Sequence, residues 1–181
     1  FEPERVRAGE ELDRDHHEWL LCQHDAQGNP VGERLFDLGN DEARNWLISH
    51  VNGLIKESHV AIYRQDFNFN PAPIWAENEA DDRIGMLENR HAQGYLAYWD
   101  AIILANPGLW IDSCASGGRR NDLETMRRAV PLHYTDIGYG HHPIKQKQHR
   151  EMFEWIPYFR AHNMNWDNAE TGAYENGGRP T

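Results

Sequence analysis

Two aspartates in this sequence each follow an apolar segment and could act together as a pair of carboxylates. Asp66 ends the run VAIYRQD (residues 60–66), and Asp136 ends the run AVPLHYTD (residues 129–136). Glycoside hydrolysis needs two facing carboxyl groups, because one attacks the anomeric carbon while the other protonates the leaving oxygen. The pair therefore predicts sugar cleavage with Asp66 and Asp136 as catalytic residues. Spacing alone leaves a structural alternative open, in which Asp66 forms a buried ion pair with Arg64 and Asp136 caps a loop.

The residue two positions before Asp66 is a cation, Arg64. Side chains alternate along an extended backbone, so Arg64 and Asp66 project to the same face. A nearby cation lowers the pKa of a carboxylate, and a nucleophilic carboxylate has to be charged. Arg64 is therefore predicted to keep Asp66 ionised.

The segment SCASGGRRND (residues 113–122) follows another apolar stretch and combines small residues with charges. Gly117 lets the backbone come close to a bound ligand, since no side chain stands in the way. Arg120 and Asp122 can pair with each other or with the hydroxyl groups of a sugar. The GxxxxGK[ST] pattern of phosphate-binding loops is absent. A tight turn between a strand and a helix explains the same glycines, so this segment alone leaves both interpretations open.

Aromatic residues near these motifs suggest a surface for a sugar. Trp75 lies in the proline-bearing segment after Asp66, and an exposed indole there would stack on the apolar C–H face of a sugar ring. Trp166, in the segment NMNWDN, is a second candidate. Most of the other tryptophans are assigned to the core by default.

The eleven histidines do not form a metal-binding pattern. They include the adjacent pairs His16-His17 and His141-His142, but no HExxH or CxxC spacing accompanies them. The first pair is expected to be solvated, and the second could line a pocket mouth near Asp136. No metal and no cofactor is expected.

The composition limits the classes of partner. The formal net charge is −11, and phosphate binding needs a basic patch, so no nucleic-acid partner is expected. No apolar run approaches the roughly 20 residues of a membrane span, so no membrane partner is expected. An acidic chain suits a neutral ligand such as an oligosaccharide or a glycoconjugate. Cys22 and Cys114 do not make a disulfide framework, and the compartment and oligomeric state stay open.

Helical and extended segments alternate along the chain. Helices are predicted over residues 41–56, 88–105 and 122–128, and strands over residues 60–63, 109–111 and 129–134. Asn40 is the candidate N-cap of the first helix. Pro131 weakens the last strand, because proline cannot donate to a sheet ladder. Residues 69–82 are predicted to lack regular structure, because they contain Pro71 and Pro73.

This alternation predicts an α/β fold with parallel strands joined by helices. A dinucleotide-binding fold would carry a glycine fingerprint after an early strand, and none is present. Polar residues follow each predicted strand instead, as they do at the active-site end of a (β/α)8 TIM barrel. A complete barrel takes about 250 residues. The chain is therefore predicted to be a single catalytic-barrel fragment over residues 1–181, with residues 171–181 as a tail or loop. A smaller open sheet is the alternative.

Four segments in this order resemble glycoside hydrolase family 36, which contains α-galactosidases and α-N-acetylgalactosaminidases. They are FEPE (residues 1–4), RQDFN (64–68), SCASGGRRND (113–122) and TD (135–136). The resemblance extends from Phe1 to about Asp136. It implies a retaining mechanism on a (β/α)8 barrel, of which this chain would hold the middle strands, roughly the third to the seventh.

The resemblance also implies roles for individual residues. In the family motif K-x-D-x-N the aspartate is the nucleophile, and it falls on Asp66. Arg64 stands where lysine is usual, which keeps the charge but changes its geometry. Asn68 matches the asparagine that binds a substrate hydroxyl. Asp136 falls on the acid/base aspartate of a T/R-S-D-like motif, with threonine in place of serine.

The family loop that resembles C-S-x-G-G-G-R-x-D maps to Cys114, Gly117, Arg120 and Asp122. Cys114 and Gly117 would shape the pocket near C2 of the sugar. The family barrel also uses two aspartates and a tryptophan from strands earlier than FEPE, and this sequence lacks them. Three alternatives therefore stay open: a non-catalytic carbohydrate-binding or inactive truncated relative, an α-N-acetylgalactosaminidase, and a transglycosylase that resembles raffinose synthases.

Overall fold

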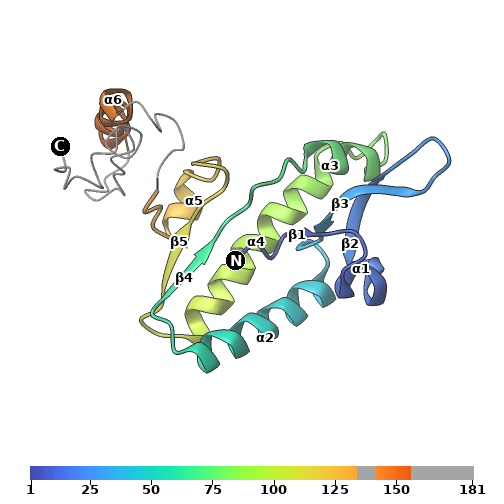
Figure 1. The fold of residues 1–181 in the computed structure, drawn as a ribbon, viewed down its shortest axis with the longest axis horizontal. Helices are drawn as coiled ribbons and strands as arrows, with labels where there is room; N and C mark the ends of the chain where they lie inside the picture. The colour runs from blue at the N-terminus through green and yellow to red at the C-terminus, as the bar shows by residue number, and fades with distance from the viewer. Residues whose placement is uncertain (134–141, 156–181) are drawn as a thin grey trace, which may run out of the picture.

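The computed structural model of the chain describes residues 1–133 and 142–155 (Figure 1). The strands are β1 (Arg5–Val6), β2 (Leu20–His24), β3 (Pro30–Phe36), β4 (Ile62–Gln65) and β5 (Trp110–Ser113). The helices are α1 (Glu11–Asp15), the 3-10 turn η1 (His17–Trp19), α2 (Asp41–Ser58), α3 (Ala72–Asn78), α4 (Met86–Ala105), α5 (Leu123–Met126) and α6 (His142–Phe153).

Parallel strands form one part of the fold, as the alternation predicted. β4 pairs with β5 in parallel, with Arg64 opposite Asp112. The ladder continues on both sides: Asp66 N–H donates to the Phe1 carbonyl at 2.9 Å, and the Phe1 amino group donates to the Arg64 carbonyl at 3.1 Å. On the other side Val130 forms a parallel bridge with Asp112. Four segments thus lie in the order Phe1, β4, β5 and Val130. Within residues 129–133, the described part of the last predicted strand, pairing is limited to this bridge.

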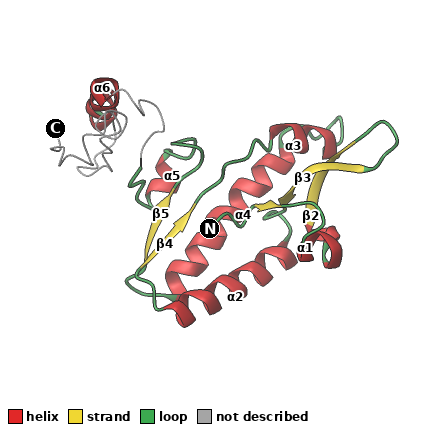
Figure 2. Ribbon diagram, in the orientation of Figure 1, coloured by secondary structure: helices red, strands yellow, loops and turns green. Residues whose placement is uncertain are grey.

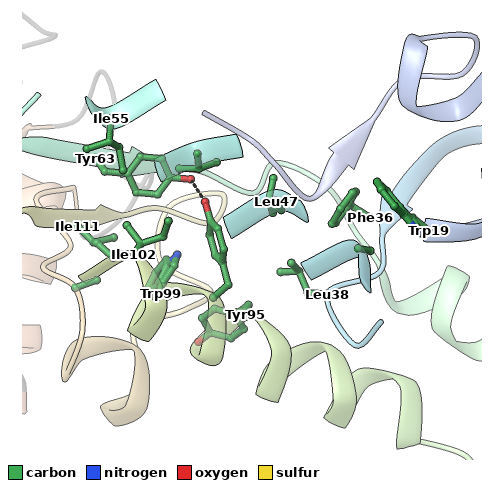
Figure 3. Packing of buried hydrophobic residues seen from close by; sticks show 14 of the residues in the cluster. Trp19, Phe36, Leu38, Leu47, Ile55, Tyr63, Tyr95, Trp99, Ile102 and Ile111 are labelled. Carbon is green, nitrogen blue, oxygen red and sulfur yellow. Dashed lines mark hydrogen bonds between the residues drawn. The ribbon is translucent and has the colours of Figure 1, made fainter. Parts of the chain in front are cut away.

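One face of the parallel pair is covered by helix α4, which packs in turn on α2. Figure 2 shows α2 and α4 converging near the base of β4 and β5. The Tyr63 hydroxyl on β4 is 2.8 Å from that of Tyr98 on α4, the dashed contact in Figure 3. Trp99 and Ile102 of α4 are fully buried in the same cluster. The helices predicted over residues 41–56 and 88–105 are confirmed within two residues at each end.

The prediction that residues 69–82 lack regular structure was wrong, because they contain α3. Pro71 is the N-cap residue of this helix and Pro73 lies in its first turn. The first turn has no intrahelical partners for its N–H groups, so proline costs nothing there. The short buried stripe of α3, around Ile74, packs on Leu35, Phe67 and Ala115.

The first 36 residues add a small antiparallel sheet that the sequence did not predict. Its strand order is β1-β3-β2, and the β2–β3 hairpin closes through the Asp25 carboxylate, which accepts the N–H groups of Gln27 and Asn29. In Figure 1 this hairpin lies at the opposite end of α4 from β5. The described residues therefore form an α/β structure with two separate sheets, and none of their helices is long and apolar enough to span a membrane.

Gly94 lets α4 lie directly on the backbone of residues 38–39. A Cβ atom at this position would overlap the carbonyl group of Leu38, whereas a Cβ at Gly53 in α2 would meet nothing within 4 Å. We expect Gly94→Ala to lower the free energy of unfolding by about 3 kcal/mol or more, as overpacking against rigid backbone does. Gly53→Ala, the matched control, should raise it by about 1 kcal/mol. Urea unfolding of both variants checks this, and equal effects would contradict the packing described.

Candidate active site

Asp66 lies directly after β4, at the carboxyl end of the parallel strands, and is partly exposed. Its Oδ1 accepts the Phe67 N–H at 2.8 Å. Burial alone would raise the pKa of Asp66, but hydrogen bonds from Asn68, Phe67 and Cys114 and the charge of Arg64 lower it below its ordinary value. The carboxyl group is therefore ionised at neutral pH.

Arg64 forms its ion pair with Asp112 and not with Asp66. Its Nη1 is 2.5 Å from Asp112 Oδ2, across the β4–β5 register, and Asp112 is buried. The other oxygen of Asp112 accepts the Leu132 N–H at 3.0 Å. The alternative in which Arg64 and Asp66 form a buried ion pair with each other is thus wrong. Arg64 still contributes to the lowered pKa of Asp66, as the sequence predicted, but as the smallest of the causes.

The loop after β5 brings Cys114 next to Asp66 and Gly117 next to Cys114. Cys114 is buried, and its N–H extends the parallel ladder by donating to the Gln65 carbonyl at 2.8 Å. Burial raises the pKa of its thiol, which bonds to Asp66 and to the Gly117 N–H. Gly117 and Gly118 have φ of 71° and 116°, in the left-handed region that favours glycine, so the tight-turn explanation of these residues is correct.

Hydrogen bonds from Ser116 and Arg119 tie the loop after β5 to the loop after β4. Ser116 Oγ is 3.3 Å from Asn68 Oδ1, and Arg119 Nη2 donates to the Phe69 carbonyl at 2.9 Å. Asn68 is exposed, and its amide donates to Glu2. Arg64, Asp66, Asn68, Cys114 and Gly117 therefore lie together at the carboxyl ends of two neighbouring parallel strands.

Arg120 lies elsewhere, on the opposite side of β4. It forms a two-pronged ion pair with Glu4, with Nη1 2.7 Å from Oε2 and Nη2 bonded to Oε1. His91 Nε2 is 2.8 Å from Glu4 Oε1, and Gln65 Nε2 donates to Glu4 Oε2 at 2.9 Å. Gln65 and Asp66 are successive residues, so their side chains point to opposite faces. Sequence reasoning missed this network, although it quoted Glu4 within FEPE.

The Glu4 carboxylate is fully buried. Burial would raise the pKa of Glu4, but the charge and hydrogen bonds of Arg120, followed by those of His91, hold it well below the ordinary range. The Arg120 guanidinium is sandwiched between the rings of Phe67 and Tyr95, at 4.6 and 4.3 Å from their centroids. The charge of Arg120 is thus paired with Glu4 and enclosed by these two rings inside the protein.

Asp122 and Trp75 also lie apart from Asp66. Asp122 is the N-cap of α5, where its two carboxylate oxygens accept the Thr125 N–H at 2.9 Å and the Thr125 hydroxyl at 2.8 Å. Trp75 is only partly exposed, on α3, with its ring 5.4 Å from His91. It borders a cavity of about 310 Å³ on the helix side of β4, together with Phe67, His91, Tyr95, Arg119 and Arg120. Substrate contacts from Arg120, Asp122 and Trp75 remain predictions.

Asp136 lies outside the described residues, as do His141, Trp166 and residues 171–181. Its position relative to Asp66 therefore stays a prediction. Within residues 1–133 and 142–155, no group of three or more His, Cys, Asp or Glu side chains could hold a metal ion.

Comparison with known proteins places the chain in a family. The Melibiase family model matches residues 1–138, a span that includes both Asp66 and Asp136. The chain belongs to the Melibiase family. The resemblance to glycoside hydrolase family 36 is thereby confirmed, since solved α-galactosidases of that family share the fold.

Two relatives are α-galactosidases 1 and 2 of Pediococcus pentosaceus, 23% and 25% identical over 123 and 125 residues. Each match covers 67% of this chain and 17% of the relative, so the chain spans about a sixth of their length. Among solved structures, the α-galactosidase of Lactobacillus brevis is 24% identical with a TM-score of 0.66, covering 77% of this chain and 19% of that one. The α-galactosidase AgaA of Geobacillus stearothermophilus is 20% identical with a TM-score of 0.64, covering 77% and 20%.

The Glu4–Arg120 pair is expected to be essential for stability in this Melibiase member. Arg120→Met leaves the buried Glu4 carboxylate without its main partner, and breaking a buried pair from one side costs about 3–5 kcal/mol. Arg127→Met is the matched control, because the Arg127 side chain is 73% exposed and pairs with exposed Glu124. It should cost less than about 1 kcal/mol. Chemical denaturation of both variants measures the difference, and similar losses would contradict the assignment.

The lowered pKa of Glu4 also predicts an acid dependence. Above the ordinary glutamate pKa of about 4.3, Glu4 is ionised in both folded and unfolded chains and its stabilising contribution is complete. As the pH falls below that value the unfolded chain binds a proton that the folded chain does not, so this contribution declines by about 1.4 kcal/mol per pH unit. Unfolding free energies between pH 5 and about pH 3 should fall less steeply in Arg120→Met. An unchanged slope would contradict this linkage.

Proposed function

We propose that this chain is the central part of a retaining α-galactosidase that hydrolyses terminal α-galactosides. Membership of the Melibiase family supports the reaction class. Two solved neighbours, variants of AgaA, are described in complex with stachyose and with raffinose, which are oligosaccharides. The substrate is accordingly an oligosaccharide or glycoconjugate with a terminal α-galactosyl group, and no cofactor takes part.

The observation that carries the proposal is an ionised, partly exposed carboxylate at the carboxyl end of a parallel strand. Asp66 is held charged by neighbouring donors, and Asn68 and Cys114 lie beside it. A charged oxygen is what attack on an anomeric carbon requires. In barrel enzymes this end of the strands carries the catalytic residues.

We infer that the four parallel segments belong to a (β/α)8 barrel, as its third to sixth strands. The face of β4 and β5 away from α4 carries Ile62 and Trp110, whose side chains are paired across the strands and are 54% and 61% exposed. Such large apolar side chains are normally packed, and a barrel interior is filled by layers of side chains from its strands. The remaining strands of the intact protein would cover this face.

The mechanism follows from the chemistry of two carboxyl groups. Asp66 attacks the anomeric carbon, Asp136 donates a proton to the departing oxygen, and a covalent glycosyl-enzyme forms. Asp136 then acts as a base on a water molecule, which releases the sugar with retained configuration. Asn68 binds a sugar hydroxyl, and Cys114 and Gly117 form the wall near C2. Arg64, held by Asp112, adds positive charge beside the nucleophile.

Substitution of the nucleophile tests the central assignment. Asp66→Asn in the intact protein removes the attacking oxygen charge, so turnover of a nitrophenyl α-galactoside should fall about 10³-fold or more. Asp82→Asn is the control, because its side chain is 83% exposed in the loop between α3 and α4. It should keep full activity. Near-normal turnover by Asp66→Asn would remove the assignment.

Azide rescue in the same assay separates the roles of the two aspartates. In Asp66→Gly, azide attacks from the vacated side of the sugar and gives the β-galactosyl azide. In Asp136→Gly, the glycosyl-enzyme still forms and azide replaces water, which gives the α-galactosyl azide. The reverse pattern of products would exchange the two roles, and an azide product from neither variant would reject the pair.

A further inference from the structure

A cysteine, a histidine and a glutamate lie in line where β2 meets α3, away from Asp66. Cys22 Sγ is 3.6 Å from His24 Nε2, and His24 Nδ1 is 3.0 Å from Glu77 Oε1. Figure 1 shows β2 and α3 in the same end of the molecule, and the two elements are in contact. The proposed glycosidase reaction uses none of these three residues.

The local fold fixes the geometry of this cluster. Cys22 and His24 are two residues apart in β2 and so project to one side of the strand. The β2–β3 register shifts between Leu21 and Gln23, which leaves Cys22 without a paired residue in β3. The end of α3 binds the backbone of both positions: Asn78 Nδ2 donates to the Cys22 carbonyl at 2.8 Å, and Glu77 Oε1 accepts the His24 N–H at 2.7 Å.

Glu77 selects the tautomer of His24. A carboxylate accepts hydrogen bonds, so the His24 nitrogen that faces it, Nδ1, carries the proton. The other nitrogen, Nε2, then has a free electron pair directed at the Cys22 sulfur. A nucleophile, a base and a group that orients the base form the general arrangement for activating a thiol.

The surroundings keep the Cys22 thiol protonated at rest. Burial raises the pKa of Cys22, Asp13 and Glu77 raise it further, and only Arg34 lowers it. The thiol therefore needs a base at the moment of reaction, and His24 is positioned to be that base. Cys22 is partly exposed, whereas Cys114 is 6% exposed, so a reagent in solution reaches Cys22 first.

We propose that Cys22 is a reactive thiol that undergoes exchange with low-molecular-weight disulfides, with His24 as its base and Glu77 as the residue that positions His24. His24 Nε2 takes the thiol proton while the sulfur attacks one sulfur of the disulfide. The disulfide bond breaks, a mixed disulfide forms on Cys22, and the released thiolate takes the proton from His24. One disulfide and one thiol are consumed and one of each is formed, so the step is balanced.

The test follows the reaction of the intact protein with 5,5′-dithiobis(2-nitrobenzoic acid) at pH 7, with peptide mapping to locate the modified cysteine. The fast phase should map to Cys22 and disappear in Cys22→Ser. His24→Gln removes the base and should slow this phase about 10-fold or more. Glu77→Gln should slow it by a smaller factor, because Nε2 keeps its place but loses its orienting partner.

His17→Gln is the matched control, since its side chain is 82% exposed and its Nδ1 lies 3.7 Å from the Glu18 carboxylate. The fast phase of the thiol reaction in His17→Gln should have the same rate as in the unsubstituted protein. If the cluster merely covers the thiol, His24→Gln would open it and the reaction would become faster. A rate in His24→Gln that is unchanged or higher, or a fast phase that maps to Cys114, overturns the proposal.

Discussion

The buried carboxylate of Glu4 is the constraint on which the arrangement of the site depends. Its partners come from three places far apart in the sequence: Gln65 in β4, His91 in α4 and Arg120 in the loop after β5. Moving a carboxylate out of water costs several kcal/mol, so the charge is tolerated only when its partners are in place. This requirement brings the first residues of the chain, two parallel strands and the covering helix into a single arrangement.

The network and the proposed nucleophile occupy opposite faces of the same strand. On the face of β4 that is covered by α4, the Gln65 side chain is hydrogen-bonded to Glu4 and to the Trp99 indole, which donates to Gln65 Oε1 at 2.9 Å. The next residue is Asp66, so rigid bonding of Gln65 also fixes the direction in which Asp66 projects. Arg120 similarly anchors the end of the loop that carries Cys114 and Gly117. The buried Glu4–Arg120 pair, on the face of β4 that is covered by α4, thus helps to position Asp66 and its neighbours on the opposite face.

Much of the fold was predictable because it follows from local chemistry. Asn40 does cap α2, with its side-chain oxygen 3.0 Å from the Glu42 N–H, and the apolar spacing fixes the extent of α2 and α4. The antiparallel sheet was not predictable from the sequence. β1 has only two residues, and the side chains of β3 are exposed at its start and buried at its end instead of alternating between the two. The prolines at the start of α3 were interpreted as excluding regular structure, but proline is compatible with the first turn of a helix.

Five of the candidate residues lie together at the end of β4 and β5, but their hydrogen-bond and ion-pair partners were not predictable. Alternation along a strand correctly put Arg64 and Asp66 on one face, yet the partner of Arg64 is Asp112, which is set by the register between strands. Arg120 and Asp122 were candidates for sugar contacts because their charges follow a glycine-rich turn. The actual partner of Arg120 is Glu4, which depends on the direction in which that turn leaves the sheet, and no spacing in the sequence encodes it. Asp122 instead caps α5 through Thr125, a local contact three residues along the chain.

Helix α3 links the proposed site to the cysteine cluster. The loop that leads into it from Asp66 is bound by Arg119, through the Phe67 and Phe69 carbonyls, and its other end is bound to β2 through Glu77 and Asn78. The helix has only seven residues and one fully buried apolar side chain, Ile74, so its position is set largely by these two attachments. A bulky group on Cys22 would strain the attachment at β2. The loop after Asp66 leads directly into the same helix. A displacement of α3 would therefore shift Asn68 before it affected the buried network around Glu4.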